Sequence, residues 1–229
     1  MSSTQSAAGA RSILNAAVAL FAEEGYGAVS VAAIAVQAGV SKANVFHHFE
    51  SKEALYLAVM KAASAEHADY AEELYQQPGS SADKVRKLIE FEIHNMLENH
   101  HRTRLILRES SESCHQRVRK VARTVFQRNF TAVVNIFEQG RDSGEFRAGI
   151  DPAASAMLLG GATHFFFSCR DALSEFRESN GLEAPQVYAS RISNLILSGV
   201  LAKPQAAGST STSTSTSTKK SSTRRKADK

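Results

Sequence analysis

The residues whose types and spacing point most clearly to chemistry lie within 30–52 of this 229-residue chain. Gly39 separates two short segments with helical apolar spacing, an arrangement typical of two helices joined by a tight turn. The second segment begins with Lys42, Ala43 and Asn44. An asparagine amide can hydrogen-bond the edge of an adenine, and a lysine can reach a guanine or a phosphate. Because the alanine between them permits close approach, we expect this segment to enter the major groove of DNA.

Serines mark the starts of the helices that must position these side chains. Ser30, Ser41 and Ser51 each precede a helical pattern, where a serine hydroxyl can cap the free N–H groups of the first turn. An earlier amphipathic helix ends at Gly25, in the position that a helix-terminating glycine takes. Val40 fills the gap between the two short helices. We therefore expect helices over 11–24, 31–38 and 42–49, and a longer one from 52 onward.

The rest of the chain also has helical spacing. Pro78 and Gly79 interrupt the pattern, since neither fits easily within a helix. Beyond them apolar positions recur three or four residues apart, without the period of two that indicates a strand. Pro152 suits the first turn of a helix. We predict an all-α fold of about nine helices, with further helices over 82–99, 101–109, 113–141, 152–177 and 185–201.

The two ends of the chain differ in composition from the middle. Residues 1–9 are small and polar, and residues 204–229 are mostly Ser and Thr followed by Lys and Arg. Neither end can bury an apolar core, so we expect both to be disordered. The tail either adds weak attraction to DNA or only aids solubility. The predicted organisation is a disordered arm at 1–9, a helix-turn-helix domain at 10–52, a ligand-binding and dimerisation domain at 53–203 and a disordered tail at 204–229.

Charge and composition limit the classes of protein to which this chain can belong. The formal net charge is +4, but residues 219–229 hold six Lys or Arg and one Asp, which leaves −1 for the rest. A general positive field is therefore missing, and a few well-placed cations would have to hold DNA. No apolar run reaches the ~18 residues that cross a bilayer, and the first residues lack a signal-peptide pattern. Cys114 and Cys169 lie far apart without metal-ligand spacing, which favours reduced thiols in the cytoplasm over a redox switch or a disulfide.

The run from Arg11 to Met60 resembles the N-terminal domain of the TetR family of transcriptional regulators. The matching segments are Ile-Leu-x-Ala-Ala-x-x-Leu-Phe-Ala-Glu-x-Gly-Tyr, Ser-Val-x-x-Ile-Ala-x-x-Ala-Gly-Val-Ser-Lys, Val-Phe-His-His-Phe and Ser-Lys-Glu-x-Leu. The resemblance implies a homodimer that recognises double-stranded operator DNA with its third helix. It also implies a ligand-binding C-terminal domain of five or six helices. Most members of the family are repressors, so repression is the expected activity, and activation is the alternative.

Carried over residue by residue, the resemblance implies two kinds of DNA contact. Major-groove contacts fall to Lys42, Ala43, Asn44 and His47, and phosphate contacts to Ser30, Ser41, His48 and Lys52. Ser30 and Lys52 lie at helix N-termini, where free N–H groups and the helix dipole favour a phosphate. At Phe46 the family usually has a tyrosine whose hydroxyl meets the DNA backbone, so here that contact is lost or becomes apolar. The alternative for His47 and His48 is an exposed polar helix end.

Aromatic residues are frequent in the C-terminal helices, and as a set they suit an apolar cavity with a few polar anchors. Ordinary core packing is the alternative. The candidate pocket residues are Phe91, His94, Asn95, Phe126, Phe130, His164, Phe165 and Ser168. A basic cluster within 100–120 would attract an acidic amphiphile such as a fatty acid or an acyl thioester. The other interpretation of that cluster is a solvated face paired with acidic side chains. The expected effector is thus a small apolar or acidic amphiphile.

The last two helices carry small residues that permit close contact between helices, among them Gly160 and Gly161. The resemblance suggests that these helices pair with their copies in a four-helix interface. Its expected apolar stripe is Ile192, Leu195, Ile196 and Val200. In such a dimer two recognition helices lie about one DNA turn apart and recognise a palindrome. We expect a ligand to move the helix at 101–109, which shifts the fourth helix and takes the recognition helices out of register.

Two other classes of function fit parts of the sequence. The paired histidines at 47–48 and 100–101 have no third ligand at zinc spacing, and neither a Ser-His-Asp set nor a glycine-rich phosphate loop occurs. We therefore expect neither catalysis nor a bound metal or cofactor. The second class is a DNA-binding architectural or partner-controlled factor without a small-molecule ligand. A solid C-terminal core would favour that alternative.

Overall fold

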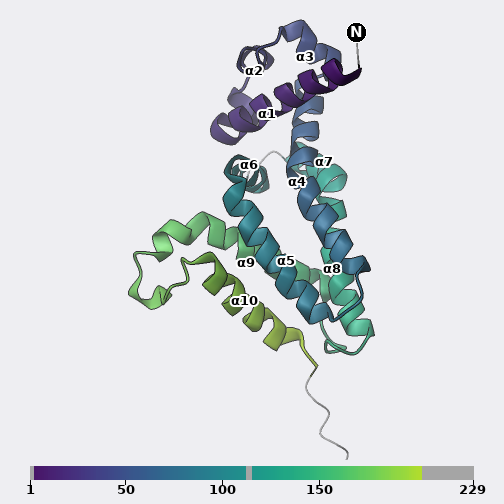
Figure 1. Cartoon of the computed structure of the whole chain (residues 1–229), viewed down its shortest axis with the longest axis vertical. Helices are drawn as coiled ribbons and strands as arrows, with labels where there is room; N and C mark the ends of the chain where they lie inside the picture. The colour runs from purple at the N-terminus through teal and green to yellow at the C-terminus, as the bar shows by residue number, and fades with distance from the viewer. Residues whose placement is uncertain (1–2, 112–114, 203–229) are drawn as a thin grey trace, which may run out of the picture.

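The computed structural model describes residues 3–111 and 115–202, and their regular elements are helices (Figure 1). The elements are α1 (Ser3–Ala28), α2 (Val31–Ala38), α3 (Lys42–His48), α4 (Lys52–Gln76), α5 (Ser81–Glu98), α6 (His100–Ser111), α7 (His115–Val121), the π-helix η1 (Ala122–Phe126), α8 (Gln127–Asp142), α9 (Pro152–Leu173), the 3₁₀-helix η2 (Arg177–Ser179) and α10 (Pro185–Val200). Because α7, η1 and α8 follow one another without a break, the described ranges hold nine helical segments besides η2. The predicted all-α fold is confirmed.

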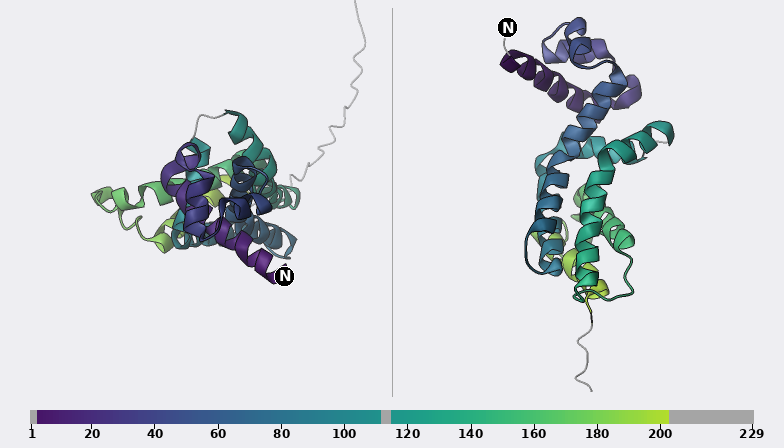
Figure 2. Two further views of the ribbon diagram at one scale, coloured as in Figure 1. Left: turned by 90° about the horizontal axis from the view of Figure 1, so that it is seen from above. Right: turned by 90° about the vertical axis from the view of Figure 1, so that its right-hand side faces the viewer.

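The first three helices and the start of α4 form a small head at one end of the molecule (Figure 2). Ser30 Oγ and Ser41 Oγ accept hydrogen bonds from the backbone N–H groups of Ala33 (3.0 Å) and Asn44 (3.1 Å), respectively. Gly39 ends α2 in the left-handed conformation with a φ of 68°, which a glycine adopts without strain. The predicted turn between two serine-capped helices is therefore confirmed.

The N-terminal arm differs from its prediction. We expected disorder over 1–9, whereas α1 already begins at Ser3. Alanines and serines continue this helix without a proline to stop it, and alanine has the highest helix propensity. The extension lies beside α3, because a Cβ atom built on Gly9 would lie 3.3 Å from His48 Nε2. At the other end, Gly25 interrupts the helix with a φ of 84°, at the predicted position.

The fourth helix, α4, runs from the head into a body in which α5, α8, α9 and α10 surround a second core (Figures 1 and 2). Along this body α4 packs against α8, and α5 packs against α9 and α10. The head core extends beyond residue 52, because it includes Leu105 of α6, Val121 of α7 and Val125 of η1. The head and the body thus meet in a packed junction that α6 and α7 build.

The carboxylate of Glu145 caps the N-terminus of α5 at the end of the body remote from the head. Glu145 accepts hydrogen bonds from Ser80 Oγ (2.5 Å) and from the backbone N–H groups of Ser81 (2.7 Å) and Ala82 (3.0 Å). Burial raises the pKa of Glu145, but these hydrogen bonds and the charge of Lys84 outweigh it and lower that pKa overall. The helix dipole of α5 favours a negative charge at this position.

The other predicted helices of the body agree with α5, α6, α7–α8 and α10 to within two residues at each end. The exception is α9, which ends at Leu173 rather than at 177 and is followed by η2. In 3–111 and 115–202 no helix is long and apolar enough to cross a membrane. The tail predicted to be disordered, 204–229, lies outside the described residues.

Candidate DNA interface and ligand cavity

The third helix, α3, exposes the side chains expected to meet the bases. Lys42, Ala43, Asn44 and His47 are exposed, whereas Val45 points into the head core and is 1% exposed. Lys42, Asn44 and His47, which can hydrogen-bond to DNA, therefore share the outer surface of α3. The inner side of this helix packs on the head core through Val45. This surface can meet base edges when α3 lies in a major groove.

Phe46 adds an apolar group to this surface. Its ring is 44% exposed, and Lys42 Nζ lies 6.0 Å from the ring centroid. A phenyl ring can contact a thymine methyl but offers no hydrogen bond to a phosphate. Ser30 and Ser41 are exposed at the N-termini of α2 and α3, where phosphates bind most readily.

Two residues expected to contact phosphates also lie against other parts of the head. Lys52 Nζ lies 4.4 Å from the centroid of the Tyr26 ring and 3.5 Å from the carbonyl oxygen of Gly27. Burial, and then the positive charge of Arg117, lower the pKa of Lys52. His48 is half-buried beside the N-terminal extension of α1. Lys52 thus contacts the loop after α1, and His48 lies beside the extension of α1.

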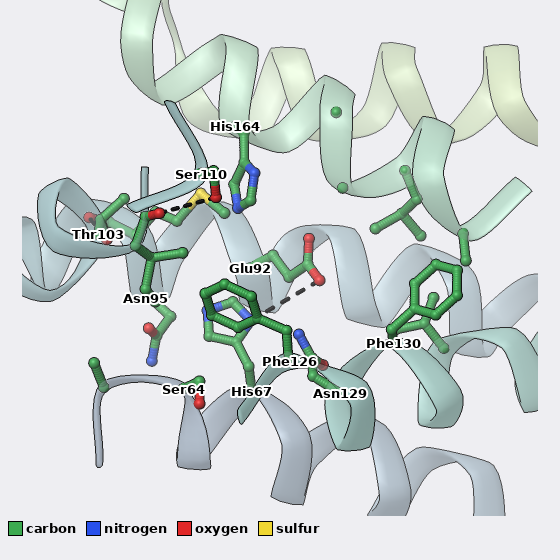
Figure 3. A pocket seen from close by; sticks show the side chains of 18 of the residues that line it. Ser64, His67, Glu92, Asn95, Thr103, Ser110, Phe126, Asn129, Phe130 and His164 are labelled. Carbon is green, nitrogen blue, oxygen red and sulfur yellow. Dashed lines mark hydrogen bonds and ion pairs between the residues drawn. The ribbon is translucent and has the colours of Figure 1, made fainter. Parts of the chain in front are cut away.

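A cavity of about 400 Å³ lies in the body, bordered by α4, α5, α6, η1, α8 and α9 (Figure 3). This volume is within the range of small-molecule sites, ~300–1,000 Å³. Apolar side chains form most of its wall, among them Met96, Ile106, Phe126, Phe130, Val133 and Leu159. Such a wall suits the apolar body of a ligand.

Four of the predicted pocket residues line this cavity, namely Asn95, Phe126, Phe130 and His164 (Figure 3). The other four do not. Phe91 stacks on Tyr70 with ring centroids 4.0 Å apart, and His94 is exposed in an ion pair on the surface of α5. Phe165 is 58% exposed, and Ser168 lines a separate surface hollow. The cause is helical phase, since adjacent helix residues point about 100° apart and apolar composition does not fix which of them faces inward.

The sequence predictions did not include the polar centre of the cavity wall. Glu92 of α5 is 5% exposed, and its Oε2 accepts a hydrogen bond of 2.9 Å from Thr163 Oγ1 of α9. His67 Nδ1 of α4 lies 3.9 Å from Glu92 Oε1. One signal was present, because Glu92 follows the buried Leu88 by four residues on the apolar stripe of α5. An acidic residue on such a stripe indicates a buried polar site.

Two further polar groups lie at this centre. Burial lowers the pKa of His164, an effect that the negative charge of Glu92 opposes and that His67 reinforces. The neutral imidazole is therefore favoured. Asn129 Oδ1 is buried and has no hydrogen-bond partner among the described residues. The cavity thus combines an apolar wall with a carboxyl group that can accept hydrogen bonds.

One helix, α6, connects the cavity to the head. Ile106 lines the cavity. Two residues further along, Arg108 donates hydrogen bonds of 3.2 Å each to the carbonyl oxygens of Glu23 and Glu24 in α1. The guanidinium group lies so close to Gly25 that a Cβ atom there would be 2.7 Å from it. A movement of α6 at the cavity would therefore displace these hydrogen-bonded groups of α1.

A buried ionic network lies at the same junction. Glu109 of α6 is 1% exposed and accepts hydrogen bonds from Tyr56 OH of α4 (2.6 Å) and from Arg117 Nε of α7 (3.1 Å). The guanidinium carbon of Arg117 lies 4.7 Å from the centroid of the Tyr26 ring. One buried carboxyl group thus ties α4, α6 and α7 together beneath the head.

The stripe predicted as a dimer interface is mostly used within the protomer. Ile192, Ile196 and Val200 pack in or against the body core. Leu195 is 67% exposed. Leu158 and Phe165 of α9 are also exposed, at 59% and 58%. The latter two are seven residues apart and lie on one side of that helix. The apolar side of α10 is directed inward against α5, which the repeat of apolar residues alone could not reveal.

The basic residues within 100–120 are divided, because His100, Arg104 and Arg108 line the same surface hollow as Ser168 whereas others form ion pairs. Arg102 pairs with Glu66 at 3.7 Å, and Lys120 pairs with Glu53 at 2.5 Å. These pairs join α6 and α7 to α4, which agrees with the interpretation of a paired, solvated face. Within 3–111 and 115–202 no group of three or more His, Cys, Asp or Glu side chains could hold a metal ion. Cys169 is a half-buried free thiol, and Cys114 lies outside the described residues.

Two family models match this chain. The model for bacterial regulatory proteins of the tetR family matches residues 13–59, and the model for the tetracyclin repressor-like C-terminal domain matches residues 82–196. The fatty acid metabolism regulator protein of Bacillus subtilis (strain 168) is 25% identical over 152 residues, which are 65% of this chain and 76% of that protein.

Solved structures have the same fold. A TetR family transcription regulator from Marinobacter aquaeolei VT8 superposes with a TM-score of 0.70 at 18% identity, covering 88% of this chain and 100% of that one. The transcriptional regulator FadR from Bacillus subtilis, in complex with stearoyl-CoA, superposes with a TM-score of 0.67 at 20% identity, covering 82% and 98%. Because the C-terminal model alone spans half of the chain and the N-terminal model covers the head, the chain belongs to the TetR family of bacterial regulatory proteins and is a DNA-binding transcriptional regulator.

Proposed function

We propose that this regulator is a repressor that binds a palindromic operator as a homodimer in the cytoplasm and leaves it when a small molecule fills the cavity. The observation that carries the proposal is the position of α6, which lines the cavity through Ile106 and holds the head through Arg108. A partner-controlled or architectural factor needs no such cavity, so the alternative lacks this support. The relative named a fatty acid metabolism regulator agrees with control by a small apolar molecule.

The coupling runs from the cavity wall to two contacts of α6. A ligand that displaces α6 separates Arg108 from the α1 carbonyl groups and shifts Glu109 against Tyr56 of α4. Both movements turn the head relative to the body, which changes the spacing of the two recognition helices in the dimer. A ligand that distinguishes the two states by about 1–3 kcal/mol would weaken operator binding about 5–150-fold.

On the operator, α3 lies in the major groove. The side chains that face the bases are Lys42, Ala43, Asn44 and His47, and Phe46 makes an apolar contact beside them. Ser30 and Ser41, with the free N–H groups of the helices that they cap, meet phosphates. His48 and Lys52 act by positioning the head, since their side chains contact α1 and the loop after it.

A second copy of the chain covers the exposed apolar side chains of α9 and α10. These are Leu158, Phe165 and Leu195, which water would otherwise surround. Replacing Leu158 and Leu195 together by Asp is expected to give a monomer in sedimentation measurements and to weaken binding to a palindromic operator. A dimer that survives both changes would show that the interface lies elsewhere.

Selection of bound sequences from random duplex DNA tests the proposed function. The wild-type chain should enrich a palindrome, and Asn44→Ala should relax the preference at one base pair in each half-site. Asn135→Ala in α8, far from the head, is the matched control and should enrich the same palindrome as the wild type. Absence of any enriched sequence would refute operator recognition by α3.

A further inference from the structure

We infer that the effector presents a hydrogen-bond donor, a hydroxyl or an ammonium group, to Glu92, and that the cavity rejects a carboxylate at this position. The inference rests on the proposed function, because it specifies which chemistry the effector cavity accepts.

Glu92 has acceptor capacity that the protein leaves unused. Its Oε2 accepts one hydrogen bond, from Thr163 Oγ1 at 2.9 Å. Its Oε1 lies 3.9 Å from His67 Nδ1, which is too long for a hydrogen bond. A carboxylate can accept about four hydrogen bonds. Glu92 also lines the cavity, so a donor on a ligand can reach the remaining acceptor sites.

Asn129 lines the same cavity but does not offer its oxygen to it. Its Oδ1 is buried without a hydrogen-bond partner among the described residues, so a ligand in the cavity does not reach that atom. Figure 3 shows both side chains among those that line the cavity. The acceptor that a donor on the ligand can reach is therefore the carboxylate of Glu92.

The charges around the cavity oppose an acidic group at this centre. Of the lining residues only Arg102 carries a permanent positive charge, and it is partly exposed and paired with Glu66. His164 and His67 flank Glu92, and burial favours the neutral form of His164. A ligand carboxylate beside Glu92 would place two like charges in a poorly solvated space. The acidic amphiphile expected from the basic cluster is therefore not the chemistry that this centre favours.

Three ten-carbon probes with the same apolar chain separate these possibilities: decan-1-ol, decan-1-amine and decanoate. Calorimetric titration of the full chain at about pH 8 should show that the better of the alcohol and the amine binds at least tenfold more tightly than decanoate. Glu92→Gln should bind decanoate at least tenfold more tightly than the wild type does. The matched control is Glu98→Gln, an exposed carboxyl group on the same helix, which should behave as the wild type.

The two donor probes distinguish the sources of the donor. Tighter binding of the amine, lost in Glu92→Gln, identifies an ammonium group, whereas tighter binding of the alcohol identifies a hydroxyl group. If Glu92→Gln does not fold, Glu92→Met serves instead and should weaken the better donor probe several-fold without weakening decanoate.

Three results would overturn the inference. These are wild-type binding of decanoate as tight as that of the donor probes, an unchanged preference in the variants, and no binding of any probe. In each case selection of operator DNA by the same protein reports separately on the repressor. Conversely, a donor probe that binds with the expected preference but leaves operator affinity unchanged would support this inference and contradict release by the ligand.

Discussion

The head and the cavity of this regulator place their polar residues in opposite ways. In the head, Lys42, Asn44 and His47 lie on the outside of α3, and the apolar side of that helix packs inward. The caps and the turn that set α3 lie within the short stretch 30–52, and its inner side packs on a core shared with α1 and α4. In the cavity the polar side chains lie inside, and they come from helices spread over 64–164.

Because of this difference, substitutions in the two regions should have different effects. A side chain on the outer surface of α3 can change without disturbing the fold, because it is exposed and few internal contacts depend on it. A polar side chain in the cavity or at the junction is held by partners on other helices, so its loss leaves buried groups unsatisfied. Changes on the outer surface of α3 should therefore affect DNA binding alone, whereas changes of polar side chains in the cavity and the junction should affect stability and the response to ligand.

The largest effect on stability is expected for Glu109→Leu. The substitution removes the buried carboxyl group that accepts hydrogen bonds from Tyr56 OH and Arg117 Nε. Breaking such a buried pair costs about 3–5 kcal/mol, so the free energy of unfolding in urea should fall by that amount. The added change Arg117→Met should restore part of it. A loss no larger than that of Glu98→Leu, an exposed site on α5, would show that the network does not hold the junction.

Operator affinity should fall by about 1–3 kcal/mol in Asn44→Ala, because one base-edge contact per half-site is lost. The free energy of unfolding should stay within about 0.5 kcal/mol of the wild-type value, since the side chain is exposed. Fluorescence anisotropy with the selected operator measures the first quantity and urea titration the second. A fall in stability equal to the fall in affinity would contradict the separation between head and body.

A gain of affinity is expected for Phe46→Tyr. The ring is 44% exposed on the outer surface of α3, so a hydroxyl group can be added without burying it. One hydrogen bond to a phosphate is worth about 0.5–1.5 kcal/mol, which is a few-fold increase in operator affinity. The gain should be the same on all sequences, because a phosphate carries no sequence information. Unchanged affinity would indicate that this ring does not reach the DNA backbone.

The smallest effect is a dependence of stability on pH that originates in the cavity. Burial lowers the pKa of His164, so the unfolded chain takes up a proton more readily than the folded chain does. The stability is therefore complete above the unfolded pKa of about 6.5 and declines as the pH falls below it. His164→Gln should flatten this decline in urea titrations, whereas the exposed His94→Gln should not. Equal slopes in both variants would place the titrating group elsewhere.

The sequence predicts much of the head because its signals are local. Capping serines and glycines lie beside the helices that they start or end, and Val45 lies at helical spacing from the other apolar residues. The contact of Lys52 with Tyr26 was nevertheless not predicted, because it joins residues 26 positions apart. The extension of α1 to Ser3 was also missed, since small polar residues are compatible with both a helix and a disordered arm.

The cavity was harder to predict because it depends on how separate helices are rotated. The apolar composition predicted a pocket, and Asn95 and His164 were correctly placed in its wall. It did not show which neighbours of these residues would face away. Glu92 and Asn129 could not be linked from the sequence, because the contact between α5 and α8 is set by packing of the whole body. For the same reason the sequence did not show that Ile196 packs into the core of its own body.

Transmission from the cavity to the head is tested most directly by measuring operator affinity with and without decan-1-ol, in the wild type and in Arg108→Met. The neutral probe avoids the direct binding to DNA that an amine would show. We predict that decan-1-ol lowers the operator affinity of the wild type about 5–150-fold. Arg108→Met should bind both the probe and the operator but lose most of this response, since its contacts with α1 are gone. An equal response in both proteins, or probe binding without any change in operator affinity, would contradict transmission through α6.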